Sequence, residues 1–180
     1  MATVPNPATW TVGDLLTASN LNLDLRDSLN FLLAPPLAIL IDPGTGPIPD
    51  ATVTALPWPS EAIDRDGGHS NSTNNTRYTC QTAGYYDIYC AVAWQHTTAN
   101  RRNLNIRKNG STDLAGSIFD QTAATDTSFP LYPTQSVSLK TFLSVGDYVE
   151  TTVWHNNGGA IPLSAIVTGL QRWELQWVST

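Results

Sequence analysis

The strongest constraint on the fold of this chain is an alternation of apolar and polar residues that recurs from Ala51 to the C-terminus. Three of the alternating runs predict strands: Gly84–Trp94, Asn103–Lys108 and Ser136–Leu143. Asn109-Gly110 is the dipeptide most typical of a two-residue β-hairpin, and Gly146-Asp147 separates two alternating runs in the same way. About eight short strands in this part of the chain favour an all-β sandwich or barrel.

Composition agrees with an all-β domain and argues against one class of partner. Charged residues are only 13% of the chain and hydrophobic residues are 41%, while 12 Gly and 12 Pro favour strands and turns over long helices. The net charge of -6 would repel a phosphate backbone, so we expect no nucleic-acid partner. We expect the basic cluster at the predicted hairpin to be a solvated edge: Arg101, Arg102, Arg107 and Lys108.

A single helix is predicted within residues 10–33, with Thr17 as its N-cap and Asn20 at the third helical position. The helix must end before Pro35-Pro36, because a residue that precedes proline is displaced from the helical conformation. Its apolar face consists of five leucines: Leu21, Leu25, Leu29, Leu32 and Leu33. A helix of about four turns is marginal alone. The leucines must therefore be covered by the β domain, by sister subunits or by another protein.

Prolines and glycines follow this helix, and they predict an extended linker over residues 36–50 rather than a strand of a central sheet. The chain is thus predicted to have three parts: an N-terminal attachment segment (1–35), the Pro/Gly linker (36–50) and a β head (51–180). The apolar stretch Leu32–Ile41 is too short to span a membrane, so no membrane partner is expected. The first residues lack the basic and apolar regions of a secretory signal.

Four segments of the β head have a familiar order and spacing: Asp64–His69, Arg77–Tyr86, Ile106–Gly110 and Leu143–Val149. Together they resemble the trimeric jelly rolls of the tumour-necrosis-factor and complement-head type, in which a small-Gly-x-Tyr corner like Ala83–Tyr86 starts a core strand. The resemblance covers residues 51–180. It implies an antiparallel jelly-roll sandwich that associates as a homotrimer.

The N-terminal part is similar to the leader of many short proteins of tailed bacteriophage virions, such as head-fibre, decoration and minor tail proteins. The similar residues are Thr9–Ala18, Asn22, Arg26 and Phe31–Pro36. This resemblance implies a structural virion protein, made and assembled in the bacterial cytoplasm, whose trimeric knob is attached to capsid or tail proteins. The attachment residues would be Trp10, Leu21, Leu25, Leu29 and Leu32. The alternative is a minor tail or short spike protein whose knob binds a host-surface receptor or glycan.

The sequence predicts no enzyme, because it contains no nucleophile elbow, His-Glu-x-x-His or phosphate-binding loop. No cofactor or metal site is predicted, and we expect the three histidines, His69, His96 and His155, to be solvated loop residues. Asp64 and Asp66 are expected to accept hydrogen bonds from backbone N–H groups in a turn.

Two further sets of residues are interpreted from their alternating positions. Four aromatic residues are assigned to the core or to a trimer interface, with glycan stacking as the weaker alternative: Tyr86, Trp94, Trp173 and Trp177. Cys80 and Cys90 are expected to be buried free thiols, with a disulfide between them as the alternative.

Overall fold

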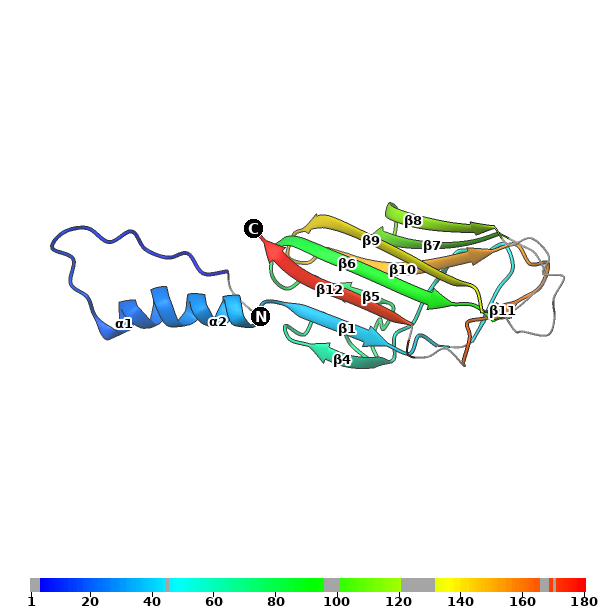
Figure 1. Cartoon of the computed structure of the whole chain (residues 1–180), viewed down its shortest axis with the longest axis horizontal. Helices are drawn as coiled ribbons and strands as arrows, with labels where there is room; N and C mark the ends of the chain where they lie inside the picture. Colours follow the sequence, from blue (N-terminus) through cyan, green and yellow to red (C-terminus); the bar gives the residue numbers. More distant parts are fainter. Residues whose placement is uncertain (1–3, 45, 96–100, 121–131, 166–168, 170) are drawn as a thin grey trace.

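The computed structural model describes residues 4–44, 46–95, 101–120, 132–165, 169 and 171–180, and it shows a β-sandwich from which an N-terminal leader projects (Figure 1). All strand pairings among the described residues are antiparallel. The strands are β1 Leu37–Ile41, β2 Pro47–Ile48, β3 Thr54–Ala55, β4 Ser60–Asp64, β5 Arg77–Thr79, β6 Gly84–Ala93, β7 Arg101–Lys108, β8 Thr112–Asp120, β9 Thr134–Leu143, β10 Tyr148–His155, β11 Ile161–Pro162 and β12 Arg172–Ser179. The predicted all-β jelly-roll sandwich with one N-terminal helix is confirmed.

Two large sheets form the layers of the sandwich. The first sheet has the strand order β4-β1-β12-β6-β9 and faces the viewer in Figure 1. The second has the order β3-β10-β7-β8, and β5 also pairs with β10, while β2 and β11 form a small separate ladder. Because side chains alternate across each strand, one face of each sheet can be apolar and meet the other sheet in the core.

The core between the sheets is rich in aromatic residues. Tyr86, Trp94 and Trp173 are completely buried and Trp177 is 9% exposed, so all four predicted aromatic residues lie in the core of the protomer. Gly84 is the glycine of the Gly-x-Tyr corner, and sterics require a glycine there, because a Cβ atom would collide with the indole of Trp177. Cys80 and Cys90 are also buried, and both are free thiols.

The two predicted turns have different roles. Asn109 and Gly110 both have positive φ, at 51° and 73°, as a two-residue hairpin turn requires, and they join β7 to β8 as predicted. Gly146 also has a positive φ, but its turn leads from β9 in the first sheet to β10 in the second. The prediction that Gly146-Asp147 resembles the Asn109-Gly110 hairpin was therefore wrong, because β9 and β10 are not hydrogen-bonded to each other.

The predicted linker over residues 36–50 was wrong for Leu37–Ile41, which forms β1 inside the first sheet. β1 pairs with β12 on one side and with β4 on the other. Ala38 and Leu40 are completely buried. The prolines flank this apolar run instead of interrupting it, so none of them removes a hydrogen-bond donor from the strand. The β head therefore begins directly after Pro36.

The helix of the leader has three consecutive segments: α1 Ala18–Leu21, the π-helical turn η1 Asn22–Arg26 and α2 Asp27–Leu33. Thr17 is the N-cap, as predicted, and its hydroxyl accepts a hydrogen bond from the N–H of Asn20. The π-helical turn is marked by a bond from the N–H of Asp27 to the carbonyl of Asn22, five residues earlier.

Three polar side chains expected in solvent are buried. The side chains of His69 and His155 have no exposed surface, and Arg102 is completely buried. His155 bonds the carbonyl of Ile48 at 2.9 Å through Nε2. Arg102 alternates onto the inner face of β7 with Leu104, and its guanidinium lies 5.7 Å from the Trp94 ring. The solvated-histidine prediction was wrong for His69 and His155, and the solvated-edge prediction was wrong for Arg102; His96 lies outside the described residues.

Candidate interaction surfaces

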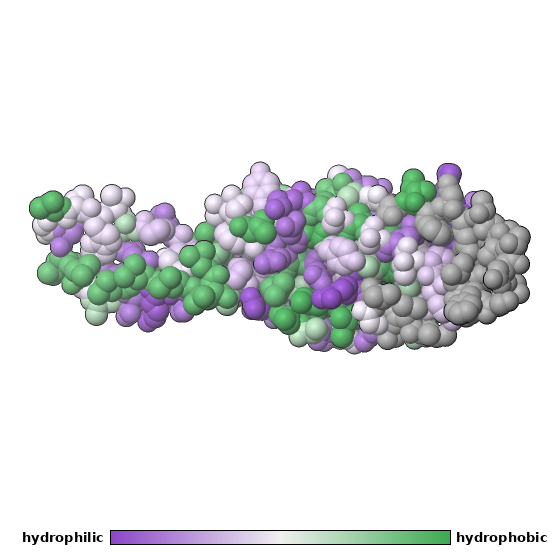
Figure 2. Space-filling view, in the orientation of Figure 1, coloured by the Kyte–Doolittle hydropathy of each residue, from purple (hydrophilic) through white to green (hydrophobic). Residues whose placement is uncertain are grey.

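The leader carries a continuous line of exposed leucines. Leu21, Leu25 and Leu29 are 36%, 56% and 56% exposed, and Leu33 continues the spacing of four residues. In a regular α-helix such a line drifts around the axis by about 40° per step, because each residue turns the helix by about 100°. The wider turn of η1 offsets this drift between Leu21 and Leu25, which keeps these two leucines close to one face. Figure 2 shows a band of apolar side chains along this side of the leader.

The other face of the helix is covered by the extended segment that precedes it. This segment begins near the sandwich and runs outward beside the helix to the tip of the leader, from which the helix leads back to the sandwich (Figure 1). The N–H of Ala8 donates to the carboxylate of Asp24, which is 8% exposed on the helix. At the tip, the N–H and hydroxyl of Thr11 donate to Asp14 and lower the pKa of that carboxyl. The extended segment therefore helps to bury Asp24, while Leu21, Leu25 and Leu29 remain exposed.

Trp10 and Leu32 differ from the leucine line in their positions. Trp10 is 41% exposed and lies with Leu23 and Asp24 around a hollow between the extended segment and the helix. Leu32 is 70% exposed and borders a cavity next to Trp177. Of the five predicted attachment residues, the structure thus places Leu21, Leu25 and Leu29 on one face and Leu32 beside it, while Trp10 lies on the opposite side of the helix.

The leader is packed against the head. Phe31 is 7% exposed, and its ring meets the Trp177 ring edge-on, with centroids 4.8 Å apart and an interplanar angle of 87°. The Trp177 indole donates to the carbonyl of Ala83, and the Trp177 N–H donates to the carbonyl of Pro36. Val4 also packs against the core. These contacts fix the leader to the end of the sandwich where the chain also ends (Figure 1).

A second exposed apolar surface lies on the outer face of the first sheet. Tyr85 and Tyr89 on β6 and Phe142 on β9 are 43%, 38% and 43% exposed. Tyr85 and Phe142 are paired across the two strands, with ring centroids 5.4 Å apart. We call these three side chains the aromatic face. Their positions alternate with those of the core aromatic residues, so β6 carries large aromatic groups on both of its faces.

The sequence interpretation missed the aromatic face, although the strand contains a signal for it. Tyr85, Tyr86 and Tyr89 cannot all point to one side of a strand, because side chains separated by an odd number of residues lie on opposite sides. Once Tyr86 is assigned to the core, Tyr85 and Tyr89 must face outward. A strand that exposes two tyrosines is typical of a contact surface.

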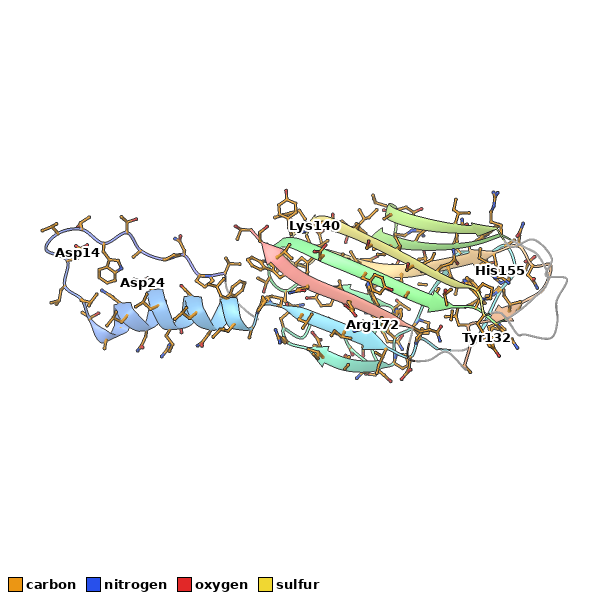
Figure 3. The ribbon with its side chains drawn as sticks, in the orientation of Figure 1. Asp14, Asp24, Tyr132, Lys140, His155 and Arg172 are labelled. Atoms are coloured by element: carbon orange, nitrogen blue, oxygen red, sulfur yellow. The ribbon has the colours of Figure 1, made fainter. Side chains whose placement is uncertain are left out.

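Charged and metal-binding groups add little to these surfaces. Lys140 and Asp87 form an exposed ion pair of 3.4 Å between β9 and β6, and Arg172 pairs with Glu174 on β12. Figure 3 shows Lys140 and Arg172 on this sheet, Asp14 and Asp24 on the leader, and His155 and Tyr132 at the opposite end of the molecule. Within the described ranges, no three His, Cys, Asp or Glu side chains gather as metal ligands would. No helix in the same ranges has the length and apolarity needed to cross a membrane.

The strand order and the two-layer core define a tumour-necrosis-factor-like jelly roll. A crystal structure of murine APRIL at pH 5.0 has a TM-score of 0.58 and 15% identity, and the match covers 79% of this chain and 98% of that chain. A crystal structure of murine APRIL at pH 8.5 has a TM-score of 0.55 and 16% identity over the same shares. No family model matches the sequence. No curated protein matches it either. At this level of identity the likeness shows the fold, and it confirms the fold that the sequence resemblance implied.

Proposed function

We propose that the chain is a structural protein of a tailed-bacteriophage virion, a surface-exposed homotrimeric decoration or head-fibre knob that is attached to the particle through its leader. The observation that carries the proposal is the line of exposed leucines on a leader that is firmly packed against a jelly-roll head. The similarity of Thr9–Ala18 and Phe31–Pro36 to the leaders of phage virion proteins supports a phage particle as the structure to which the leader binds. Assembly would then take place in the bacterial cytoplasm.

The homotrimer is supported by the fold and by the aromatic face. Tumour-necrosis-factor-like jelly rolls are typically trimeric, and a cyclic trimer needs a surface that each subunit can bury against its neighbours. Tyr85, Tyr89 and Phe142 supply such a surface. Aromatic side chains are enriched at protein interfaces because they bury a large area and lose few rotamers.

Attachment is supported by the apolar area of the leader. Fully burying a leucine side chain contributes about 1.5–3 kcal/mol relative to leaving it exposed. The leucine line therefore gives a docking surface of useful strength, and its projection from the sandwich leaves the rest of the head free (Figure 2). The capsid or tail proteins would cover the leucine line.

The oligomeric state is tested by light scattering on the purified chain, whose mass is 19.5 kDa. We expect about three times this mass for the wild type. Tyr89→Arg should give a smaller species, because the arginine places a positive charge in the aromatic face that the trimer would bury. Val145→Arg is the matched control, since Val145 is 57% exposed on the turn between β9 and β10. A wild-type monomer at micromolar concentration contradicts the trimer.

Attachment is tested by adding the wild type, Leu25→Asp and Val53→Asp to particles that lack the endogenous protein. Leu25→Asp places a charge in the leucine line and should abolish incorporation. Val53→Asp changes an exposed valine of the head and should incorporate normally. If Leu25→Asp reaches wild-type occupancy, the leader is not the anchor.

The number of copies per particle distinguishes the two kinds of virion protein. Hundreds of copies per particle support a decoration protein, whereas a few copies support the alternative of a tail or spike protein.

A further inference from the structure

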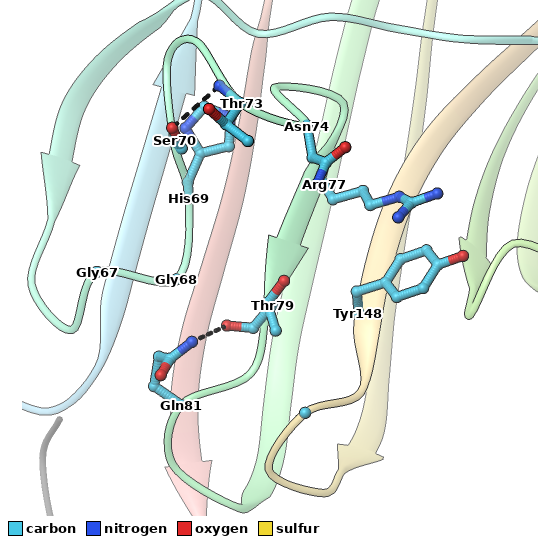
Figure 4. Close-up of a pocket in the computed structure, with 11 residues that line it drawn as sticks. Gly67, Gly68, His69, Ser70, Thr73, Asn74, Arg77, Thr79, Gln81 and Tyr148 are labelled. Carbon is cyan, nitrogen blue, oxygen red and sulfur yellow. Dashed lines mark hydrogen bonds between the residues drawn. The ribbon is translucent and has the colours of Figure 1, made fainter.

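A polar groove lies beside β5, the short strand at the border of the second sheet (Figure 4). Thr79 and Gln81 lie along its floor. Ser70 and Thr73 come from the loop between β4 and β5, and Arg77 and Tyr148 lie on the other side. None of the described residues that line the groove carries a carboxylate. In a chain with a net charge of -6, this groove combines many hydroxyl and amide groups with a positive charge.

The loop that borders the groove is held in place by hydrogen bonds. The carboxylate of Asp64 accepts from the N–H groups of Gly68 and His69 at 3.2 and 3.0 Å. The buried His69 ring lies between Glu61, 2.7 Å from Nδ1, and the carbonyl of Asn75, 3.2 Å from Nε2. The N–H of Thr79 donates to the carbonyl of Gly68 at 2.7 Å. A loop with this many bonds is preorganised, so it loses little conformational entropy when it binds a ligand.

Arg77 is the cationic group of the groove. Its guanidinium lies 4.1 Å above the centroid of the Tyr148 ring, which holds the planar group in a fixed orientation. Nε forms an ion pair with the carboxylate of Glu150 at 3.8 Å, which offsets part of its charge, but this separation is longer than a direct hydrogen bond. The Arg77 side chain is 39% exposed. It therefore has N–H groups available for a carboxylate, which guanidinium binds with a pair of parallel bonds.

We propose that this groove binds an acidic saccharide, a sugar whose carboxylate pairs with Arg77 and whose hydroxyls bond Thr79, Gln81 and the loop residues. Saccharide hydroxyls need donors and acceptors that are closely spaced, and side chains of this kind line the groove. A peptide strand would need apolar pockets for alternate side chains, which this polar lining does not offer. A nucleic acid would need several Lys or Arg side chains to neutralise its successive phosphates, and Arg77 is the one Lys or Arg among the groove residues that the structure describes.

This inference does not depend on the virion assignment, and the groove is separate from the surfaces proposed for trimer contact and attachment. Its floor strand pairs with β10 in the second sheet, while the aromatic face lies on the outer side of the first sheet. The leucine line is on the leader. Saccharide binding can therefore fail while trimer formation and particle incorporation stay intact, and each result is measured separately.

The ligand class is tested by calorimetric titration of the full chain with tetragalacturonate, its neutral methyl ester, tetraglutamate and inorganic phosphate. We expect tetragalacturonate to bind at least about tenfold more tightly than each of the other three, because only this ligand presents both hydroxyls and a carboxylate. Equal binding of the methyl ester overturns the role of the carboxylate. Equal binding of tetraglutamate or phosphate overturns the saccharide.

The location is tested with Arg77→Gln, Thr79→Val and Arg26→Gln. Arg77→Gln should weaken tetragalacturonate binding by about tenfold or more, because it removes a charge-assisted pair. Thr79→Val keeps the shape of the side chain but removes a hydroxyl from the floor, and it should weaken binding several-fold. Arg26→Gln is the matched control, an exposed arginine paired with Asp27 on the leader.

Thermal unfolding shows whether each variant is folded. Wild-type affinity in both Arg77→Gln and Thr79→Val overturns this location. If Arg77→Gln is unfolded, two other measurements locate the site. One is the affinity of Thr79→Val, and the other is the shift of the wild-type amide NMR signals of Arg77, Thr79 and Gln81 when tetragalacturonate is added. No change at those amides overturns the proposal.

Discussion

At the scale of single residues, the head depends on polar side chains whose partners are distant in sequence. Tyr78 donates to both oxygens of Asp66, at 3.0 and 3.2 Å, in the interior. Burial raises the pKa of Asp66, and the hydrogen bond from Tyr78 opposes part of that rise. Burial also raises the pKa of Tyr78, so its hydroxyl remains a donor. The pair connects the start of the β4 to β5 loop with β5 and helps to fix the wall of the groove.

Asp147 is a residue whose effect on stability can be measured through pH. Hydrogen bonds from Lys108 and Asn109, together with the N–H of Ser144, lower its pKa from 3.8 to about 2. Since the unfolded state keeps the ordinary value, the native state favours the ionised carboxylate. Its contribution to stability is complete above pH 4 and is lost as the pH falls from about 4 to about 2.

We therefore expect Asp147→Asn to flatten the dependence of the unfolding free energy on pH between 4 and 2. Urea denaturation at several pH values compares this variant with the wild type. Asp113→Asn is the control, because Asp113 pairs with Arg107 at a half-exposed site near the same hairpin. A slope in Asp147→Asn equal to that of the wild type would show that the turn between β9 and β10 does not stabilise the ionised group.

At the scale of elements, the sequence predicted those strands and turns whose signals are local. The β7 to β8 hairpin follows from Asn109-Gly110, because few other residues adopt positive φ at both positions. β1 was missed because its five apolar residues lie between prolines, and a short apolar run can belong to a buried strand as well as to a connector. The pairing of β1 with β12 joins residues far apart in sequence, so no local pattern reports it.

The leader shows the same division between local and distant information. The N-cap at Thr17 and the leucine spacing are local, and both were predicted. The contact between Phe31 and Trp177 was not predicted. These residues lie near opposite ends of the chain, so no local sequence pattern connects them. The predicted Pro/Gly linker suggested two uncoupled parts. The packing of Phe31 couples them.

We expect Phe31→Ala to release the leader from the head. Replacing a buried Phe by Ala costs about 3–5 kcal/mol in a core that cannot relax, and here much of that cost can be avoided if the leader detaches. Limited proteolysis should then cut within residues 4–33 at a much higher rate, while the β-sheet circular dichroism stays unchanged. Leu32→Ala removes a similar apolar group that is 70% exposed and should leave the cleavage rate close to that of the wild type. Equal protection of Phe31→Ala would mean that other contacts hold the leader.

At the scale of the whole molecule, the head contributes far more residues to the hydrophobic core than the leader does. Most of the core residues lie in the sandwich, and Phe31 is the one buried apolar residue of the leader among those described. A chain of residues 34–180 keeps β1 and the carbonyl of Pro36 that bonds Trp177. We therefore expect this truncated chain to fold and to form the trimer, with loss of particle incorporation.

Circular dichroism, light scattering and incorporation into depleted particles measure these three properties of residues 34–180. A chain that begins at residue 42 is the informative control, because it lacks β1 and should fail to fold. If residues 34–180 decorate particles at wild-type occupancy, the head itself makes the attachment.

The position of the two chain ends has a practical consequence for display of foreign peptides. Thr180 borders the cavity that Val4, Pro5 and Leu32 also line, so the C-terminus lies at the base of the leader (Figure 1). If the leader attaches the protein to a particle, as we propose, a cargo fused after Thr180 would be held between the head and the particle surface. The exposed turn at Gly158 and Gly159 follows β10 at the far end of the sandwich, and Gly158 already has a positive φ of 82°. In the trimeric, particle-attached arrangement that we propose, peptides inserted there would point away from the particle, with three copies on each knob.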